Sequence, residues 1–372
     1  MPPFKFNTIT RAEIQRSKGG DRMINAIDFS GENHMLISGC PGSGKTTVCL
    51  MRAQRLANEQ KSVAVFSYQN LLVASLRNLL QENVQVFAYF KWYGNILKRM
   101  ASVDTADEMI QNLADTPRFE EILIDEGQDF EIKILQALIS KCSNVCIGAD
   151  NAQRIHKQGM TVNEIDLELS RTNNVQRFSL EYNYRNTFEI YNFARYFVPE
   201  AERANNPAVL SQMNKGNGNK PIVFKVISEQ EKLDVLKTQL QESSDKNIAI
   251  LVYYQQEVDY YHAKITEMGF TCAKYHNDFQ NQTFSLENIL ITTYKSAKGL
   301  EFETVIMPSM ENAMKQSYET QEHYYVACTR TKESLVLLIN CSDLPSWLVN
   351  FPKETYELIS PANILTQTDL PF

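Results

Sequence analysis

The sequence predicts an α/β fold whose parallel β-sheets are covered by helices on both faces, and three observations support it. Short apolar runs rich in Val, Ile and Leu recur along the chain and have the length of buried strands. Amphipathic stretches with a helical period lie between them. A glycine-rich turn joins the first apolar run to the first of these stretches. Strands that alternate with helices are typical of parallel sheets, because each crossover places a helix on a face of the sheet.

The expected elements follow in a regular order. In the first half, the sequence predicts strands at 34–39, 62–68, 120–126 and 144–150, with helices at 46–60 and 70–82. After Pro221 the pattern resumes, with strands at 221–227, 248–254, 288–294, 303–308 and 334–340 and a helix at 257–269. The chain has 372 residues, and domains of about 100–200 residues are typical. We therefore expect two α/β domains.

Composition excludes several classes of protein. The chain is 43% hydrophobic and 22% charged, which is the balance of a globular protein rather than a disordered or collagen-like one. No apolar run approaches the roughly 20 residues of a membrane span, and the N-terminal residues lack the apolar core of a signal peptide. We expect a cytoplasmic protein with no membrane partner. Seven scattered cysteines without a Cys-x-x-Cys pair indicate reduced thiols rather than a disulfide framework or a zinc site. The net charge of −7 excludes a uniformly basic surface but leaves room for a local basic groove.

A phosphate-binding loop lies between the first strand and the first helix. The segment GCPGSGKTT matches the G-x-x-x-x-G-K-[ST] pattern. Its glycines let backbone N–H groups surround phosphate oxygens, and the helix that follows directs its positive end at the same anion. Lys45 is expected to reach the β- and γ-phosphates of ATP, and the Thr46 hydroxyl to ligate Mg²⁺. The alternative, an ordinary glycine-rich turn, does not account for the full pattern in this context. The predicted nucleotide-binding residues of the loop are Gly39, Pro41, Gly42, Ser43, Gly44, Lys45, Thr46 and Thr47.

Two carboxylates follow the apolar run at 120–126. Asp125 and Glu126 emerge where ILI ends. Asp125 is expected to hold Mg²⁺ through water, and Glu126 to orient and deprotonate the attacking water. An Asp-Glu pair after a strand is commonly a solvated turn. Downstream of a phosphate loop, with one strand between them, the catalytic interpretation is favoured.

The motifs resemble those of superfamily 1 DNA helicases and translocases of the UvrD/Rep/PcrA branch. The resemblance is first recognised in two motifs, DEGQD and GCPGSGKTT. VFSYQNLLVASLR resembles motif Ia, IGADNAQRIH motif III and LEYNYRN motif IV. ITTYKSAKGLEF resembles motif V and YYVACTRTKESL motif VI. The blocks occur in the family's order and span residues 39–335.

The resemblance implies two RecA-like P-loop NTPase domains with ATP in the cleft between them. We expect an N-terminal domain at 1–177, a C-terminal domain at 178–341 and a tail at 342–372. Arg185 and Arg330 would be arginine fingers on the γ-phosphate. The resemblance also implies that Gln153 senses the γ-phosphate, that Tyr184 stacks on adenine and that Glu301 reaches the ribose.

The expected nucleic-acid contacts rest on motifs Ia and V. The matching positions are Ser67, Tyr68 and Asn70 in the first domain and Thr293 in the second. An aromatic segment, FAYFKWYGN at 87–95, lies near the position of motif Ib. Its rings could stack on bases, which is sequence-tolerant, or could fill a core, and the sequence leaves both open.

Several positions depart from the family pattern. Gln15 is the only candidate for the adenine-reading glutamine, but its surroundings do not match the usual phrase. His156 and Gln158 stand where an aromatic pair is expected in motif III, and Lys295 replaces a histidine in motif V. The spacing between motifs leaves no room for the two accessory domains that relatives insert, so a minimal form of the family is expected.

Two functions of different classes follow. The first is an ATP- and Mg²⁺-dependent translocase or helicase on single-stranded DNA with 3′–5′ polarity, for which translocation is favoured over unwinding because the accessory domains are missing. The second is a regulatory NTPase subunit that senses ATP and DNA and controls a partner nuclease in DNA repair or phage defence. A P-loop kinase for a small molecule would not explain AKGLEF or VACTR.

Overall fold

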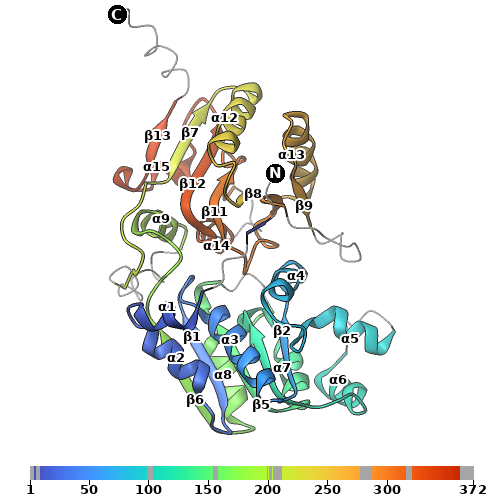
Figure 1. Cartoon of the computed structure of the whole chain (residues 1–372). Helices are drawn as coiled ribbons and strands as arrows, with labels where there is room; N and C mark the ends of the chain where they lie inside the picture. Colours follow the sequence, from blue (N-terminus) through green and yellow to red (C-terminus); the bar gives the residue numbers. More distant parts are fainter. Residues whose placement is uncertain are drawn as a thin grey trace, which may run out of the picture. The chain divides into compact units, whose positions relative to one another are not determined.

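The computed structural model contains two compact units. It describes residues 4–5, 9–98, 104–153, 158–198, 200, 203, 212–276, 287–315 and 321–360. The first unit is Phe6–Tyr184, and the second is Arg185–Phe372 together with Met1–Lys5. Each unit contains one β-sheet in which every strand pair is parallel (Figure 1). The predicted α/β class with helix-covered parallel sheets is confirmed.

The sheet of the first unit has six strands in the order β3-β2-β4-β5-β1-β6. Their bounds are β1 His34–Gly39, β2 Val63–Ser67, β3 Gln85–Ala88, β4 Phe119–Asp125, β5 Cys142–Ala149 and β6 Val175–Leu180. Two short 3₁₀ helices, η1 Gly127–Asp129 and η2 Asn151–Gln153, follow β4 and β5. The carboxyl ends of parallel strands share one edge of the sheet, which is where ligands bind in open α/β folds.

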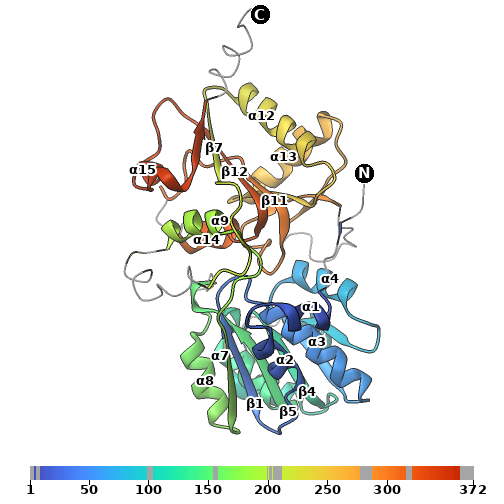
Figure 2. The same ribbon diagram turned by 60° about the vertical axis from the view of Figure 1, so that its left-hand side comes forward.

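Helices cover both faces of this sheet. On one face lie α1 Arg11–Arg16, α2 Gly20–Asp28, α3 Lys45–Asn58 and α4 Asn70–Leu79. On the other lie α5 Tyr89–Leu97, α6 Ala106–Leu113, α7 Ile132–Ile139 and α8 Val162–Ser170. Figure 2 shows α3 and α8 on opposite sides of the strands. Three of these helices begin with a capping box, in which Thr10, Thr105 or Thr161 pairs with a glutamate three residues later.

The sheet of the second unit has seven strands in the order β13-β7-β12-β11-β8-β10-β9. Their bounds are β7 Ile222–Val226, β8 Ile248–Val252, β9 Ala273–Tyr275, β10 Ile289–Thr293, β11 Phe302–Met307, β12 Thr331–Asn340 and β13 Glu357–Ile359. The helices are α9 Phe188–Ala194, α12 Glu229–Glu242, α13 Gln255–Glu267, α14 Gln321–Cys328 and α15 Ser346–Val349, with 3₁₀ helices η3 Arg195–Phe197 and η5 Lys353–Thr355. Helices α12 and α13 cover one face of the sheet. Helix α14 packs on the other, where Cys328 contacts Met307 of β11.

The two units divide later in the chain than the sequence suggested. Strand β6 pairs with β1 along its whole length, so the first sheet extends to Leu180 and the division falls after Tyr184 rather than after residue 177. Part of the expected tail also belongs to the second sheet, because β13 pairs with β7. Residues 361–372 lie outside the described part of the chain. At the other end, Lys5 exchanges two hydrogen bonds with Asn247, which places the N-terminal segment in the second unit.

Two further expectations concern thiols and membranes. All seven cysteines are free, and four of them are buried, as expected for reduced thiols. Among the described residues, no helix combines the length and the apolar character that crossing a membrane requires.

Candidate nucleotide site

The predicted phosphate loop leads from β1 into α3. Gly42 and Gly44 have φ angles of 71° and 92°, a region in which glycine is favoured because it has no Cβ. A Cβ at Gly39 would lie 2.5 Å from Ser43 Oγ and 2.7 Å from the Leu180 carbonyl. Helix α3 begins at Lys45, so its positive end faces the loop. The loop therefore has the backbone of an anion-binding turn.

Lys45 folds back over this loop. Its Nζ donates to the carbonyls of Gly39 at 2.8 Å and Cys40 at 3.0 Å. It also lies 3.8 Å from Asp150 Oδ2, and both side chains are less than one-tenth exposed. Pro41 and Ser43 are buried, whereas Thr46 and Thr47 are half-buried on the first turn of α3. All eight predicted loop residues thus lie in one continuous segment of the first unit, from the end of β1 to the first turn of α3.

The two predicted metal ligands are in contact. Thr46 Oγ1 donates to Asp125 Oδ2 at 2.9 Å. The other carboxylate oxygen, Oδ1, is buried and has no hydrogen-bond partner in the described part of the chain. Burial, and next the charge of Glu126, raise the pKa of Asp125 to about 7, against the opposing effects of Thr46 and Lys45. A divalent cation would neutralise the Asp125 carboxylate and would be bound by Oδ1, so these residues fit Mg²⁺.

Protein side chains alone do not complete a metal site here. Among the described residues, no group of three or more His, Cys, Asp or Glu side chains could hold a metal ion. Mg²⁺ usually binds to one or two protein oxygens together with water and substrate phosphates. The Thr46–Asp125 pair beside the phosphate loop is therefore the kind of partial site that a nucleotide would complete.

Glu126 lies at the carboxyl end of β4 in an unusual backbone conformation. Its φ and ψ are 56° and 47°, a left-handed conformation that is rare for residues other than glycine and is common at functional sites. The carboxylate is almost fully buried and accepts a hydrogen bond from Gln128 Nε2 at 2.6 Å. The Gln128 side-chain oxygen Oε1 in turn accepts from the backbone N–H of Asp150 at 3.1 Å.

Gln153 belongs to the same network. Its Nε2 donates to Asp150 Oδ2 at 2.7 Å, and Asp150 is the residue that faces Lys45. The structure therefore connects the ends of β4 and β5 through side chains to the lysine of the loop. Sequence reasoning missed Gln128 and Asp150, although both lie inside motifs that it had identified, DEGQD and IGADNAQ.

Tyr184 lies beside the phosphate loop at the end of the first unit. Its N–H donates to the Gly42 carbonyl at 2.8 Å, and its hydroxyl donates to the Lys18 carbonyl at 2.6 Å. Gly19 packs so closely under this region that a Cβ there would lie 2.2 Å from the Tyr182 ring. Gln15 is exposed on the neighbouring helix α1. The ring of Tyr184 is thus fixed next to the loop through the segment between α1 and α2.

Arg185 and Glu301 lie together in the second unit. Arg185 Nε donates to Glu301 Oε2 at 3.0 Å, and Lys332 Nζ lies 2.6 Å from Glu301 Oε1. Burial alone would raise the pKa of Glu301, but Arg185 and Lys332 lower it to about 2. Lys332 was not predicted from the sequence. Glu301, expected to reach a ribose, therefore forms ion pairs with two cations here.

Arg330 is fully buried in the same unit. Its Nε donates to the Val326 carbonyl at 3.0 Å and its Nη2 to Thr329 Oγ1 at 3.3 Å. Arg185 Nη1 donates to the Thr329 carbonyl at 3.3 Å. The two predicted arginine fingers are therefore held around the same turn, which follows α14.

The predicted nucleic-acid residues of the first unit lie together at the carboxyl end of β2. Ser67 is fully buried and its Oγ accepts from the Gln69 N–H at 3.3 Å. Tyr68 is half-buried and packs edge-on against Phe90 at 5.2 Å between ring centroids. Asn70 is half-buried at the start of α4. Tyr68 and Asn70 are therefore the more accessible candidates for a contact with a strand.

The aromatic segment 87–95 is largely part of the core. Tyr89 and Tyr93 are fully buried and stack at 5.7 Å, while Phe87, Phe90 and Trp92 pack partly buried against the same core. The Tyr93 hydroxyl donates to Asp104 Oδ2 at 2.7 Å. Of the two interpretations that the sequence left open, the core interpretation holds for Tyr89 and Tyr93.

The remaining predicted positions are spread over both units. Thr293 ends β10 in the second unit, and its hydroxyl donates to Ser296 Oγ at 3.0 Å in a local turn. Lys295 and Gln158 are exposed. His156 lies outside the described residues.

Comparisons with known proteins identify similar sequences. A family model for the viral superfamily 1 RNA helicase core domain matches residues 35–339. A segment of 57 residues, 15% of this chain, is 46% identical to RecB, a subunit of the RecBCD enzyme of Chlamydia pneumoniae, and spans 5% of that protein.

Solved structures are similar over longer stretches at low sequence identity. Dbp5 of S. cerevisiae, bound to RNA and ADP BeF3, is 12% identical, with a TM-score of 0.55 over 94% of this chain and 91% of that one. This likeness shows that the two proteins share a fold. The arterivirus helicase, nonstructural protein 10, in complex with DNA is 14% identical, with a TM-score of 0.41 over 91% of this chain and 67% of that one.

The family model covers most of the chain, including both sheets. The matched range includes the phosphate loop, the carboxylates at the end of β4 and both Arg185 and Arg330. The protein therefore belongs to the viral superfamily 1 RNA helicase core domain family, and it is a nucleotide-binding enzyme of the helicase type that hydrolyses a nucleoside triphosphate.

Proposed function

We propose that this protein is a cytoplasmic ATPase that moves 3′ to 5′ along single-stranded DNA. The observation that carries the proposal is the contact between Thr46 and Asp125 beside Lys45, because it joins a metal-binding pair to a phosphate-binding loop. The two units would be the two RecA-like domains, with ATP contacted by both. Hydrolysis that depends on both domains couples chemistry to their relative movement.

In the first unit, the chain's residues would prepare the γ-phosphate for attack. Lys45 would leave the Gly39 and Cys40 carbonyls and bind the β- and γ-phosphates. Bound Mg²⁺, held by Thr46 and Asp125, would neutralise phosphate charge. Glu126 would orient and deprotonate the attacking water, with Gln128 holding its carboxylate. Gln153 would report the presence of the γ-phosphate through Asp150 and Lys45.

In the second unit, Arg185 and Arg330 would stabilise the charge of the transition state. An arginine finger contributes about 10³–10⁵ in rate in comparable NTPases. Arg185 would exchange its bond with Glu301 for one with the γ-phosphate, which frees Glu301 for the ribose while Lys332 continues to neutralise it. Tyr184 would stack on adenine.

The DNA strand would cross the carboxyl edges of both sheets. Tyr68 and Asn70 are accessible at the end of β2, and Thr293 ends β10. Ser67 would act through its buried hydroxyl, which orders the turn before α4. The described residues between α5 and β4 contain only α6, so no accessory domain is available there for duplex contacts. Translocation is therefore proposed rather than processive unwinding.

A second candidate function is a regulatory NTPase subunit that binds ATP and DNA and controls a nuclease partner in DNA repair or phage defence. The observation in its favour is the segment similar to RecB, which is named as a subunit of a larger enzyme. In this case ATP binding would change the conformation of a complex, and hydrolysis would be slow without the partner.

ATPase measurements with and without single strands test the proposal. We expect the rate to rise many-fold with single-stranded DNA, to rise less with single-stranded RNA of the same sequence, and to disappear in Lys45→Ala. Affinity for DNA should fall with salt in proportion to the phosphates contacted. A rate that single strands of either kind leave unchanged would contradict the motor and favour the regulatory subunit.

A further inference from the structure

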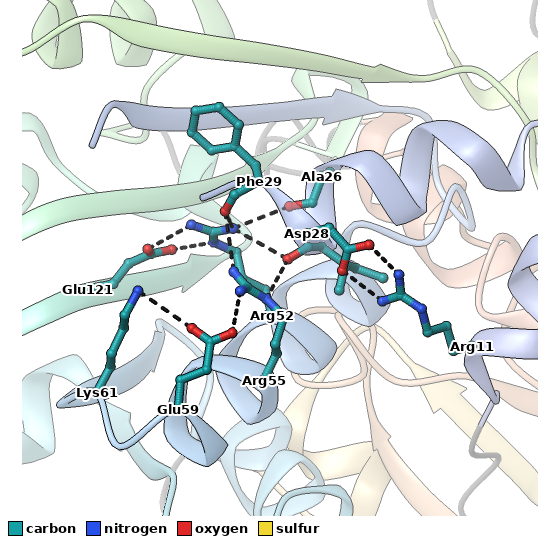
Figure 3. A network of polar contacts seen from close by, with 10 residues as sticks. Arg11, Ala26, Asp28, Phe29, Arg52, Arg55, Glu59, Lys61 and Glu121 are labelled. Atoms are coloured by element: carbon teal, nitrogen blue, oxygen red, sulfur yellow. Dashed lines mark hydrogen bonds and ion pairs between the residues drawn. The ribbon is translucent and has the colours of Figure 1, made fainter. Parts of the chain in front are cut away.

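A buried ion pair joins the helix of the phosphate loop to the strand that carries the predicted metal ligand (Figure 3). Arg52 of α3 is 2% exposed and Glu121 of β4 is 5% exposed. Arg52 Nε and Nη2 donate to the two carboxylate oxygens of Glu121 at 2.5 Å and 2.8 Å. Two parallel bonds of this kind fix the orientation of both side chains, which a single bond or an apolar contact does not.

The same guanidinium also holds the end of α2. Arg52 Nη1 donates to the Phe29 carbonyl at 2.5 Å and lies 3.4 Å from the carbonyls of Ala26 and Ile27. Arg55, one turn further along α3, donates from Nε to the Ile27 carbonyl at 3.0 Å. The last carbonyls of a helix lack partners within it and carry partial negative charge, so they are natural acceptors for these cations.

The ion pair and the metal-binding pair are two polar contacts between the same two elements. Thr46 at the start of α3 meets Asp125 at the end of β4, while Arg52 further along α3 meets Glu121 earlier on β4. Residues between these two contacts, among them Cys49 of α3 and Leu123 of β4, belong to one hydrophobic core cluster. Helix and strand therefore run in opposite directions with a directional contact near each end.

The ion pair affects how firmly α3 is held on β4, and hence the position of Thr46 relative to Asp125. Apolar contacts are non-directional, so Cys49 and Leu123 alone would let α3 slide or rotate slightly on β4. A buried ion pair is a poor source of stability, because desolvation offsets much of its attraction and an apolar pair of similar volume often serves as well. Its two fixed bonds do, however, set the position of the helix along the strand.

We propose that Arg52 and Glu121 are positioning residues that set the distance between the Thr46 hydroxyl and the Asp125 carboxylate, and hence the affinity for Mg²⁺. The proposal rests on the proposed Mg²⁺-dependent ATPase. Neither residue belongs to the predicted nucleotide or metal site. Partners outside the ligand shell of a metal typically change its affinity by about 10–100-fold when they are removed.

The test compares metal affinity with stability in matched variants. Arg52→Met or Glu121→Leu alone leaves a buried charge without its partner, so each single variant should be destabilised. The double variant Arg52→Met/Glu121→Leu removes both charges, and its resistance to urea should recover towards that of the wild type. In that folded double variant, we expect the Mg²⁺ concentration that half-saturates ATP hydrolysis to rise by about tenfold or more. ATP binding measured in EDTA should stay at the wild-type value.

Two controls separate the possible outcomes. The exposed pair of Arg11 and Asp28 belongs to the same network but contacts α1 and α2 rather than α3, so Arg11→Gln should leave the Mg²⁺ dependence unchanged. Thr46→Ala and Asp125→Asn test the metal site itself. If these two leave the Mg²⁺ dependence unchanged, the proposed function fails. If they abolish it and the double variant follows the wild-type Mg²⁺ curve, only the positioning role is overturned.

A conservative variant keeps the test decisive if the double variant does not fold. Glu121→Asp retains the charge but withdraws the carboxylate by one methylene group, so the bidentate contact with Arg52 cannot form without a shift of α3. A raised half-saturating Mg²⁺ concentration at unchanged resistance to urea supports the positioning role. An unchanged Mg²⁺ curve in this variant overturns it.

Discussion

Substitution of Glu126 by glutamine should separate ATP hydrolysis from ATP binding. Glutamine has nearly the same shape as glutamate and can keep the left-handed backbone at φ 56°. Its amide oxygen can still accept the bond that Gln128 Nε2 now donates at 2.6 Å. Lys45 and Thr46 do not contact Glu126 through any of their described hydrogen bonds. The change therefore removes the base together with its charge, which is one of the two effects that raise the pKa of Asp125.

The expected loss follows from the role of a general base. Removing one lowers kcat by about 10²–10⁴, which corresponds to roughly 3–5 kcal/mol of transition-state stabilisation. The dissociation constant for ATP should change by no more than about twofold, because the interaction lost is made only in the transition state. Steady-state hydrolysis at saturating single-stranded DNA and equilibrium binding of a fluorescent ATP analogue measure the two quantities.

Glu131 provides the matched control for this prediction. It lies five residues further along the chain, is half-buried and pairs with Lys133 at 3.3 Å. Glu131→Gln should hydrolyse ATP at the wild-type rate. If Glu126→Gln retained hydrolysis within about tenfold of the wild type, a general base at Glu126 would be refuted.

Further predictions concern stability and the nucleic-acid site. Burial, and next Lys295, lower the pKa of His323 to about 4, so the imidazole binds a proton more tightly in the unfolded chain than in the folded protein. The contribution of neutral His323 to the unfolding free energy is therefore complete above pH ~6.5 and is lost as the pH falls, by about 2–3 kcal/mol at pH 4.5. Urea unfolding of His323→Gln against the wild type should show a smaller loss between these pH values, and equal losses would contradict the assignment. Tyr93→Phe should lower the unfolding free energy by about 1 kcal/mol and leave DNA affinity unchanged in fluorescence anisotropy. Tyr68→Ala should weaken DNA binding by about 1–3 kcal/mol, and an unchanged affinity would remove Tyr68 from the DNA site.

The fold was predictable where the signal is local. The predicted strand 34–39 and helix 46–60 correspond to β1 and to α3, Lys45–Asn58, because continuous apolar runs and a glycine-rich turn mark them. Strands β3, β6, β9 and β13 were not predicted. β6 mixes polar and apolar residues at the edge of its sheet, and β13 has three residues, so neither has the apolar run of a central strand.

The site was predictable only where its residues form contiguous motifs. Lys45, Thr46 and Asp125 stand in recognisable patterns, and the structure brings them together. The pairing of Arg52 with Glu121 joins residues 69 positions apart, and it depends on the register of α3 on β4, which no local pattern encodes. Lys332 likewise becomes relevant only when β11 and β12 place it beside Glu301.

The central proposal is that both units contact ATP. Its most direct test is the single-turnover rate of ATP hydrolysis in Arg185→Ala, compared with the rates in Lys45→Ala and Arg195→Ala. Arg195 is the control, because it is half-buried in the same unit and stacks on Tyr196. We predict that Arg185→Ala binds ATP but hydrolyses it about 10³-fold or more slowly, that Lys45→Ala loses binding, and that Arg195→Ala matches the wild type. A wild-type rate in Arg185→Ala would contradict an arginine finger from the second unit.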